Sequence, residues 1–85
     1  MFFVHVLKSD KDNRTYVGYT NNLQNRLEKH NSGQVKSTKH RRPLILIFYE
    51  EFNTSAEARK RELYWKNGGG RRKLRGMLYN QVQGD

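Results

Sequence analysis

Two side chains in the first third of the sequence have the types and the spacing that phosphate and proton chemistry require. Arg26 and His30 are four residues apart, so on a helix they share one side, next to the apolar pair Leu23 and Leu27. A guanidinium group matches the geometry of a phosphate, and a histidine exchanges protons near neutral pH. The competing interpretation is an ordinary exposed polar helix face, which spacing alone favours.

Glu62 is the most informative single residue. On a helix over residues 54–66 it shares a face with Ala58 and Trp65, which are typical of a face that points to the core. A carboxylate in that position is costly unless a cation or a metal ion accompanies it. Glu62 is therefore a candidate metal ligand.

Two structural alternatives for Glu62 remain open at this point. The carboxylate could form a salt bridge with a neighbour such as Arg59 or Lys66. The opposite stripe of the helix, Ala56 and Leu63, could instead be the core side, which would leave Glu62 exposed.

Tyr16 and Tyr19 flank Gly18 in a segment with strong strand propensity. Side chains three residues apart on a strand point to opposite faces. A tyrosine on a strand more often packs against a neighbouring strand than takes part in catalysis. Gly18 indicates a close backbone approach or a bulge.

Three strands are predicted to position these residues. They are Phe2–Leu7, Arg14–Tyr19 and Pro43–Tyr49. Turn-forming residues at 9–13 predict that the first two form an antiparallel hairpin. The continuous apolar run of the third strand predicts burial on both of its faces.

Helices are predicted around these strands. The first begins near Thr20, with Asn21 and Asn22 as alternative caps, and ends at 31–33; a polar loop follows over 34–42. Thr54 and Glu57 form a capping-box pattern that opens the second helix, which residues 67–70 end. A last helix is predicted from Arg71 to about Val82, although Gly76 weakens it.

The predicted order is β-β-α-β-α, with a further α at the end. This order predicts an α+β fold in which helices flank a small three-stranded antiparallel sheet. If the connection from the second to the third strand crosses over the first, the first strand is central. We expect one domain over residues 1–82 and a frayed C-terminus at 83–85.

Composition narrows the class of protein. The 85 residues contain 17 Lys and Arg against 8 Asp and Glu, a net charge of +9, and no cysteine. Disulfides, thiolate zinc sites and cysteine nucleophiles are excluded, and no segment resembles a membrane span or a signal peptide. The charge predicts a polyanionic partner, of which nucleic acid is the leading candidate and a membrane surface the weaker one.

The basic residues concentrate in two stretches, residues 36–42 and 59–75. A solvated basic face is the alternative, but two such stretches favour nucleic-acid binding. The candidate nucleic-acid-binding residues are Lys36, Lys39, Arg41, Arg42, Lys60, Arg71, Arg72 and Lys73.

Taken in order, these segments resemble the GIY-YIG endonuclease family. The pattern is Tyr-Val-Gly-Tyr-Thr at 16–20, then Arg26 and His30, then Thr-Ser-Ala-Glu-Ala at 54–58 with Glu62. The similarity is greatest to stand-alone, single-domain bacterial members, which are related to the N-terminal nuclease domain of an excision-repair enzyme. It covers residue 2 to about residue 73.

The resemblance implies a role for each matching residue. Tyr16 would line the active site as a proposed general base, Arg26 would contact the scissile phosphate, and His30 would assist proton transfer. Glu62 would bind one divalent cation, Mg²⁺ or Mn²⁺. His5 stands where the family usually has a tyrosine, and it is a further candidate base.

The implied function is a metal-dependent endonuclease that hydrolyses DNA and selects structure rather than sequence. Branched, flapped, damaged and duplex DNA are candidate substrates, and DNA repair is a candidate role. We also expect a cytoplasmic protein that is a monomer or a weak homodimer. The alternative is a non-catalytic nucleic-acid-binding module that keeps the fold but not the reaction, which the unusual His5 favours.

Overall fold

Three antiparallel strands form the sheet in the computed structural model, which describes the backbone of residues 1–83 and the side chains of residues 1–78. The strands are β1 (Phe2–Ser9), β2 (Thr15–Thr20) and β3 (Leu44–Phe52), in the spatial order β2-β1-β3. β1 is therefore central, and the chain crosses over it between β2 and β3. The α+β class and the element order are confirmed.

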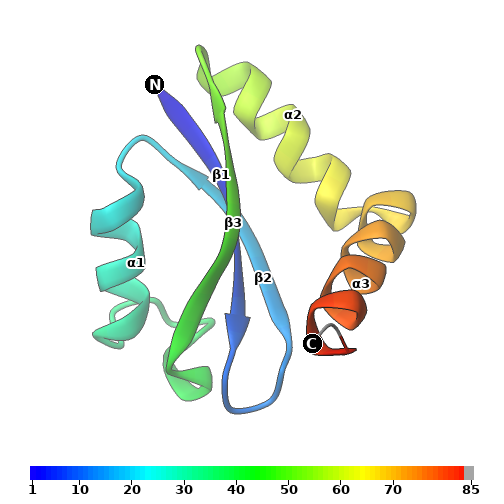
Figure 1. Ribbon diagram of the computed structural model, residues 1–85. Coiled ribbons are helices and arrows are strands. Elements are labelled where there is room, and N and C mark those ends of the chain that lie inside the picture. Colours follow the sequence, from blue (N-terminus) through cyan, green and yellow to red (C-terminus); the bar gives the residue numbers. More distant parts are fainter. Residues whose placement is uncertain (84–85) are drawn as a thin grey trace.

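Helices cover both faces of this sheet. Helix α1 (Leu23–Asn31) lies on one face, and α2 (Ser55–Lys66) and α3 (Gly68–Gln83) lie on the other (Figure 1). Val4 and Val6 of β1 are fully buried in a cluster with Ala58, Trp65 and Leu74 of α2 and α3. Because side chains alternate along a strand, His5 points to the other face, toward α1.

β3 is less buried than its apolar run predicted. Leu44 is buried, but the side chains of Ile45 and Tyr49 are 44% and 49% exposed. A continuous apolar run is typical of a strand covered on both faces, but β3 lies at the edge of the sheet and pairs only with β1. The expectation of burial on both faces is wrong.

Contacts near both ends of helix α2 fix its orientation about its own axis. Its capping box forms as predicted, with Thr54 Oγ1 accepting from the Glu57 amide at 3.2 Å. Near its other end, Trp65 Nε1 donates to Glu50 Oε1 of β3 at 2.9 Å. Ala58 and Trp65 are buried and Leu63 is exposed, so the Ala56–Leu63 stripe is not the core side.

Helix α3 begins earlier than expected. The three glycines were predicted to end α2, with a new helix from Arg71, yet α3 starts at Gly68, one residue after α2. Asn67 alone makes the break, with extended backbone angles. A Cβ atom on Gly70 would collide with the backbone carbonyl of Tyr64, so glycine is what lets the two helices meet so closely.

Local hydrogen bonds shape the segments between these elements. Asn22, one of the three candidate caps, caps α1: its Oδ1 accepts from the Asn25 amide at 3.0 Å. The loop over 34–42 contains one 3₁₀ turn, η1 (Lys39–Arg41). Of the C-terminus expected to fray at 83–85, Gln83 ends α3, and residues 84–85 lie outside the described residues.

Among the helices described, none combines the length and the apolar character that crossing a bilayer requires.

Candidate active site and nucleic-acid interface

Tyr16, Arg26 and Glu62 line one pocket at the β2 edge of the sheet. Tyr16 and Gly18 come from β2, Arg26 from α1 and Glu62 from α2. The two helices lie on opposite faces of the sheet, so their side chains can meet only around its edge (Figure 1). The structure thus brings together residues that are up to 46 positions apart in the chain, as the resemblance implied.

Two buried histidines support Tyr16 from beneath. The side chains of His5 and His30 are 1% and 0% exposed. The Tyr16 ring stacks on His5, with centroids 6.2 Å apart, and meets the His30 ring edge to face at 4.8 Å. His30 is therefore not on an exposed polar helix face, and both imidazoles adjoin the pocket through Tyr16.

Gly18 makes room for this arrangement of rings. It pairs with His5 across the sheet, and a Cβ atom at this position would lie 3.0 Å from His5 Cε1 and 3.2 Å from Tyr16 Cε1. The close approach that Gly18 indicated is therefore between the β2 backbone and two aromatic side chains.

Burial keeps both histidines neutral at pH 7. Desolvation, together with His30 and the cations of Arg26 and Lys66, lowers the pKa of His5 to about 4. Desolvation and the charge of Arg26 also lower the pKa of His30. Both His5 ring nitrogens and Nε2 of His30 have no hydrogen-bond partner among the described residues. Both imidazoles are therefore uncharged at this pH.

Glu62 has a cationic neighbour in its own helix. Its side chain is 13% exposed, and Lys66 Nζ lies 3.1 Å from its Oε2. The salt bridge left open by the sequence is therefore present, with Lys66 as the partner. An ion pair of this spacing contributes only about 0.3–0.5 kcal/mol to stability, so a competing cation can displace the Lys66 ammonium from the carboxylate.

The donor set fits one weakly held hard cation. Among the side chains that the structure describes, there is no group of three or more His, Cys, Asp or Glu that could enclose a metal ion. A Mg²⁺ or Mn²⁺ ion at Glu62 would rely on this carboxylate and complete its coordination with water and phosphate oxygens. Its position beside Arg26 suits an ion that binds together with a phosphate.

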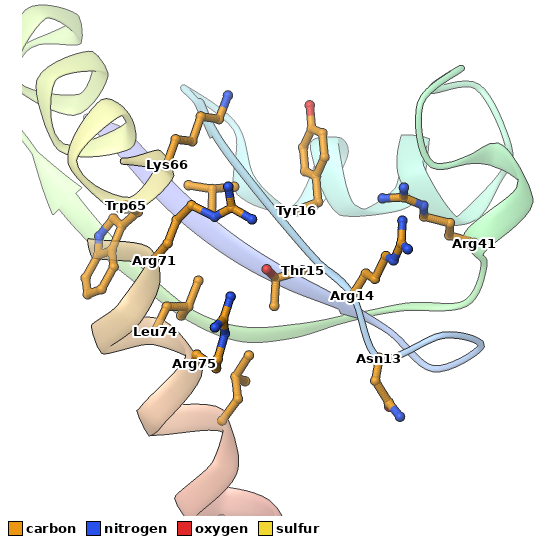
Figure 2. Close-up of a pocket in the computed structure, with 12 residues that line it drawn as sticks. Asn13, Arg14, Thr15, Tyr16, Arg41, Trp65, Lys66, Arg71, Leu74 and Arg75 are labelled. Carbon is orange, nitrogen blue, oxygen red and sulfur yellow. The ribbon is translucent and has the colours of Figure 1, made fainter. Parts of the chain in front are cut away.

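Tyr16 also lines a second, larger pocket of about 690 Å³ (Figure 2). We call this pocket the groove. Its apolar part consists of Trp65, Val17, Leu74 and Leu78. Its cations come from two sides: α2 and α3 contribute three, and the segments before β2 and β3 contribute two. They are Lys66, Arg71, Arg75, Arg14 and Arg41. The described lining includes no carboxylate.

The groove contains only part of the predicted nucleic-acid-binding set. Arg41 and Arg71 line it. The others lie outside both pockets and are exposed, on the loop (Lys36, Lys39 and Arg42) and on α2 and α3 (Lys60, Arg72 and Lys73).

Three groove cations were not singled out from the sequence. Arg75 follows Arg71 by four residues, so helical spacing could have placed it on the same side. Lys66 belongs to the same basic stretch but was predicted only as a partner of Glu62. Arg14 carries no local signal, because only the packing of α2 and α3 beside β2 places it in the same groove as their cations.

Comparison with known proteins agrees with this geometry. The sequence matches the GIY-YIG catalytic domain over residues 1–75. The chain belongs to the GIY-YIG family. This family is one of nucleases, and the match extends over all the pocket residues described above, with the exception of Leu78 at the end of the groove.

Relatives and one solved structure also match most of the chain. The UPF0213 protein YazA of Bacillus subtilis is 51% identical over 65 residues, 75% of this chain and 65% of that protein. The UPF0213 protein SH2523 of Staphylococcus haemolyticus is 40% identical over 74 residues, 86% and 89% of the two chains. The solution NMR structure of the UPF0213 protein BH0048 of Bacillus halodurans matches with a TM-score of 0.55 and 31% identity, over 93% of this chain and 85% of that one.

Proposed function

We propose that this GIY-YIG domain is a divalent-metal-dependent endonuclease that hydrolyses phosphodiester bonds of DNA and selects DNA structure rather than sequence. One observation carries the proposal. Tyr16, Arg26 and Glu62 surround a single pocket, and a groove with five cations continues from it past Tyr16. A DNA strand whose phosphate occupies the pocket would meet favourable charge along the groove.

Hydrolysis requires an anionic phosphate to accept an attacking water molecule. Arg26 is suited to bind a non-bridging oxygen of the scissile phosphate and to stabilise the charge that develops there. The Tyr16 hydroxyl is suited to orient the water, with the neutral imidazole of His30 beside its ring to accept a proton. His5 and His30 are both too deeply buried to touch a substrate, so His30 would act on the reaction only through Tyr16, and His5 supports the Tyr16 ring from below.

Glu62 would hold the divalent cation. A cation bound there supplies a positive charge near the leaving oxygen. In the free protein Lys66 pairs with the same carboxylate, and the weakness of that pair suits an exchange with the cation when DNA arrives.

Selection by structure follows from the kind of contact that the groove offers. Guanidinium and ammonium groups bind phosphates, which are common to every sequence. We therefore expect the shape of the backbone to decide which DNA enters the groove.

A cleavage panel tests the proposal. Purified protein is incubated with single-stranded, duplex, flapped and four-way-junction DNA in Mg²⁺, in Mn²⁺ and in EDTA, next to Glu62→Gln purified in parallel. We expect cleavage only with a divalent cation, and a loss of at least about a hundredfold in Glu62→Gln. DNA binding in EDTA, measured by fluorescence anisotropy, should be retained by the variant.

Two results would contradict the proposal. Cleavage by Glu62→Gln at the parental rate would remove Glu62 from the reaction. Tight binding by the parent without cleavage of any form would establish the alternative function, a nucleic-acid-binding module without activity.

A further inference from the structure

Thr38 makes a buried contact with His30 that neither the family pattern nor the pocket lining draws attention to. Both side chains are 0% exposed, and His30 Nδ1 lies 2.8 Å from Thr38 Oγ1. Nε2, the other ring nitrogen of His30, has no partner among the described residues. Since water does not reach this contact, the hydroxyl group is the feature that distinguishes the two nitrogens.

The hydroxyl group of Thr38 has a second contact, which limits what it offers to the imidazole. Thr38 Oγ1 lies 3.5 Å from the Val35 carbonyl, an oxygen that can only accept. When the hydroxyl proton is directed to this carbonyl, the oxygen lone pairs face His30 and accept a hydrogen bond from Nδ1–H. The opposite arrangement would leave a buried N–H donor at Nε2 with no acceptor among the described residues, which is unfavourable.

We propose that Thr38 is a positioning residue that holds His30 in the tautomer with the proton on Nδ1, so that bare Nε2 is the proton acceptor of the site. Nε2 is the nitrogen that Thr38 does not occupy, and the Tyr16 ring meets the His30 ring at 4.8 Å. The tautomer follows from the geometry alone. Its catalytic consequence rests on the proposed nuclease function.

The loop over residues 34–42 fixes Thr38 in place. The Thr38 amide donates to the Val35 carbonyl at 3.1 Å, and the Arg41 amide donates to the Thr38 carbonyl at 2.9 Å. The Arg41 carbonyl in turn accepts from the buried Ser9 hydroxyl of β1 at 2.6 Å. The same loop carries Arg41 into the groove, so one segment connects the DNA-facing surface to the proton acceptor.

The charged and titratable groups around His30 come from three elements. His5 of β1 faces it with ring centroids 6.0 Å apart, Tyr16 of β2 faces it at 4.8 Å, and Arg26 precedes it by one turn on α1. The loop contributes the neutral hydroxyl of Thr38. A substitution confined to Thr38 alters the chemistry of none of these neighbours.

The tautomer can be read directly by NMR. In protein labelled with ¹⁵N-histidine, a ring nitrogen that carries a proton and one that does not have well-separated ¹⁵N shifts, and His30→Gln assigns the signals among the three histidines. At neutral pH we expect a protonated Nδ1 and a bare Nε2 for His30. The reverse pattern, or an equal mixture, would overturn the proposal whether or not the protein cleaves DNA.

Two variants separate the hydroxyl from the shape of the side chain. Thr38→Val keeps the shape and removes the hydroxyl, and Thr38→Ser keeps the hydroxyl. We expect Thr38→Val to lose the fixed tautomer and to cleave about tenfold more slowly, the effect of one missing hydrogen bond. Its acid limb in the pH–rate profile should move to lower pH, because the imidazolium loses an acceptor.

Thr38→Ser should restore the tautomer, the rate and the pH profile together. A slower rate in Thr38→Val with the parental tautomer and acid limb would show that Thr38 only supports the loop, and would overturn the proposal. If Thr38→Val does not fold, the tautomers of the parent and of Thr38→Ser still decide it: both must carry the proton on Nδ1.

Discussion

In the proposed nuclease, the carboxylate of Glu62 pairs with either of two cations. Lys66 Nζ lies 3.1 Å from Glu62 Oε2 in the free protein, where a divalent ion would compete with it. We expect Lys66→Gln to lower the Mg²⁺ concentration at half-maximal cleavage by at least about twofold, the equivalent of a pair of about 0.5 kcal/mol. The measurement is a Mg²⁺ titration with DNA in saturating excess, and a higher midpoint in the variant would contradict this role of Lys66.

Gly70 decides, at the scale of elements, how closely α2 and α3 approach. A Cβ atom there would collide with the Tyr64 carbonyl, whereas one at Gly76 would meet nothing within 4 Å. We expect Gly70→Ala to reduce the free energy of unfolding by about 1–3 kcal/mol through overpacking. The matched control Gly76→Ala should raise it by about 0.5–1 kcal/mol, because alanine favours a helix. Urea unfolding measures both, and equal effects would refute the close-packing argument.

The groove is also a feature of elements, since it needs α3 beside β2. Arg71 and Arg75 line it, whereas Lys60 on α2 lies outside it. We expect Arg71→Gln and Arg75→Gln, each made singly, to weaken DNA binding in EDTA equally across sequences. The dependence of log K on log salt should become less steep by about 0.7–0.9 for each phosphate that the protein no longer neutralises.

Lys60→Gln is the matched control for the groove, because it also removes a positive charge. It should change affinity much less than either groove variant. An equal loss of affinity in Lys60→Gln would mean that overall charge, rather than the groove, binds the DNA. A loss confined to certain sequences would mean that these arginines contact bases.

The stability of the whole molecule should depend on pH through its buried histidines. The pKa of His5 is about 4 in the folded protein and 6.5 in its ordinary state, and that of His30 is lowered in the same direction. Between these values the unfolded chain binds more protons than the folded one. The free energy of unfolding therefore has its full value above pH 6.5 and decreases as the pH drops toward 4.

Urea unfolding at several pH values between 4 and 7 measures this effect. One such histidine contributes a slope of at most about 1.4 kcal/mol per pH unit. His5→Gln should flatten the dependence, and His40→Gln, at an exposed position, should leave it unchanged. A parental slope in His5→Gln would show that other groups cause the acid destabilisation.

The sequence by itself determined the features that depend on near neighbours in the chain. The Thr54–Glu57 capping box, the inward face with Ala58, Glu62 and Trp65, and the excess of positive charge all follow from local spacing and composition. The order of elements and the resemblance then predicted the sheet and the pocket side chains. Periodicity is sufficient here because each pattern is completed within two helical turns or one strand.

Only the tertiary structure decided which distant groups meet. It made β3 an edge strand, began α3 at Gly68, and brought Arg14 and Arg75 to opposite sides of one groove. It also buried His30 against Thr38, eight residues away on a loop without periodicity. These outcomes depend on packing between elements, where the cost of a collision or of an unpaired buried group outweighs local preference.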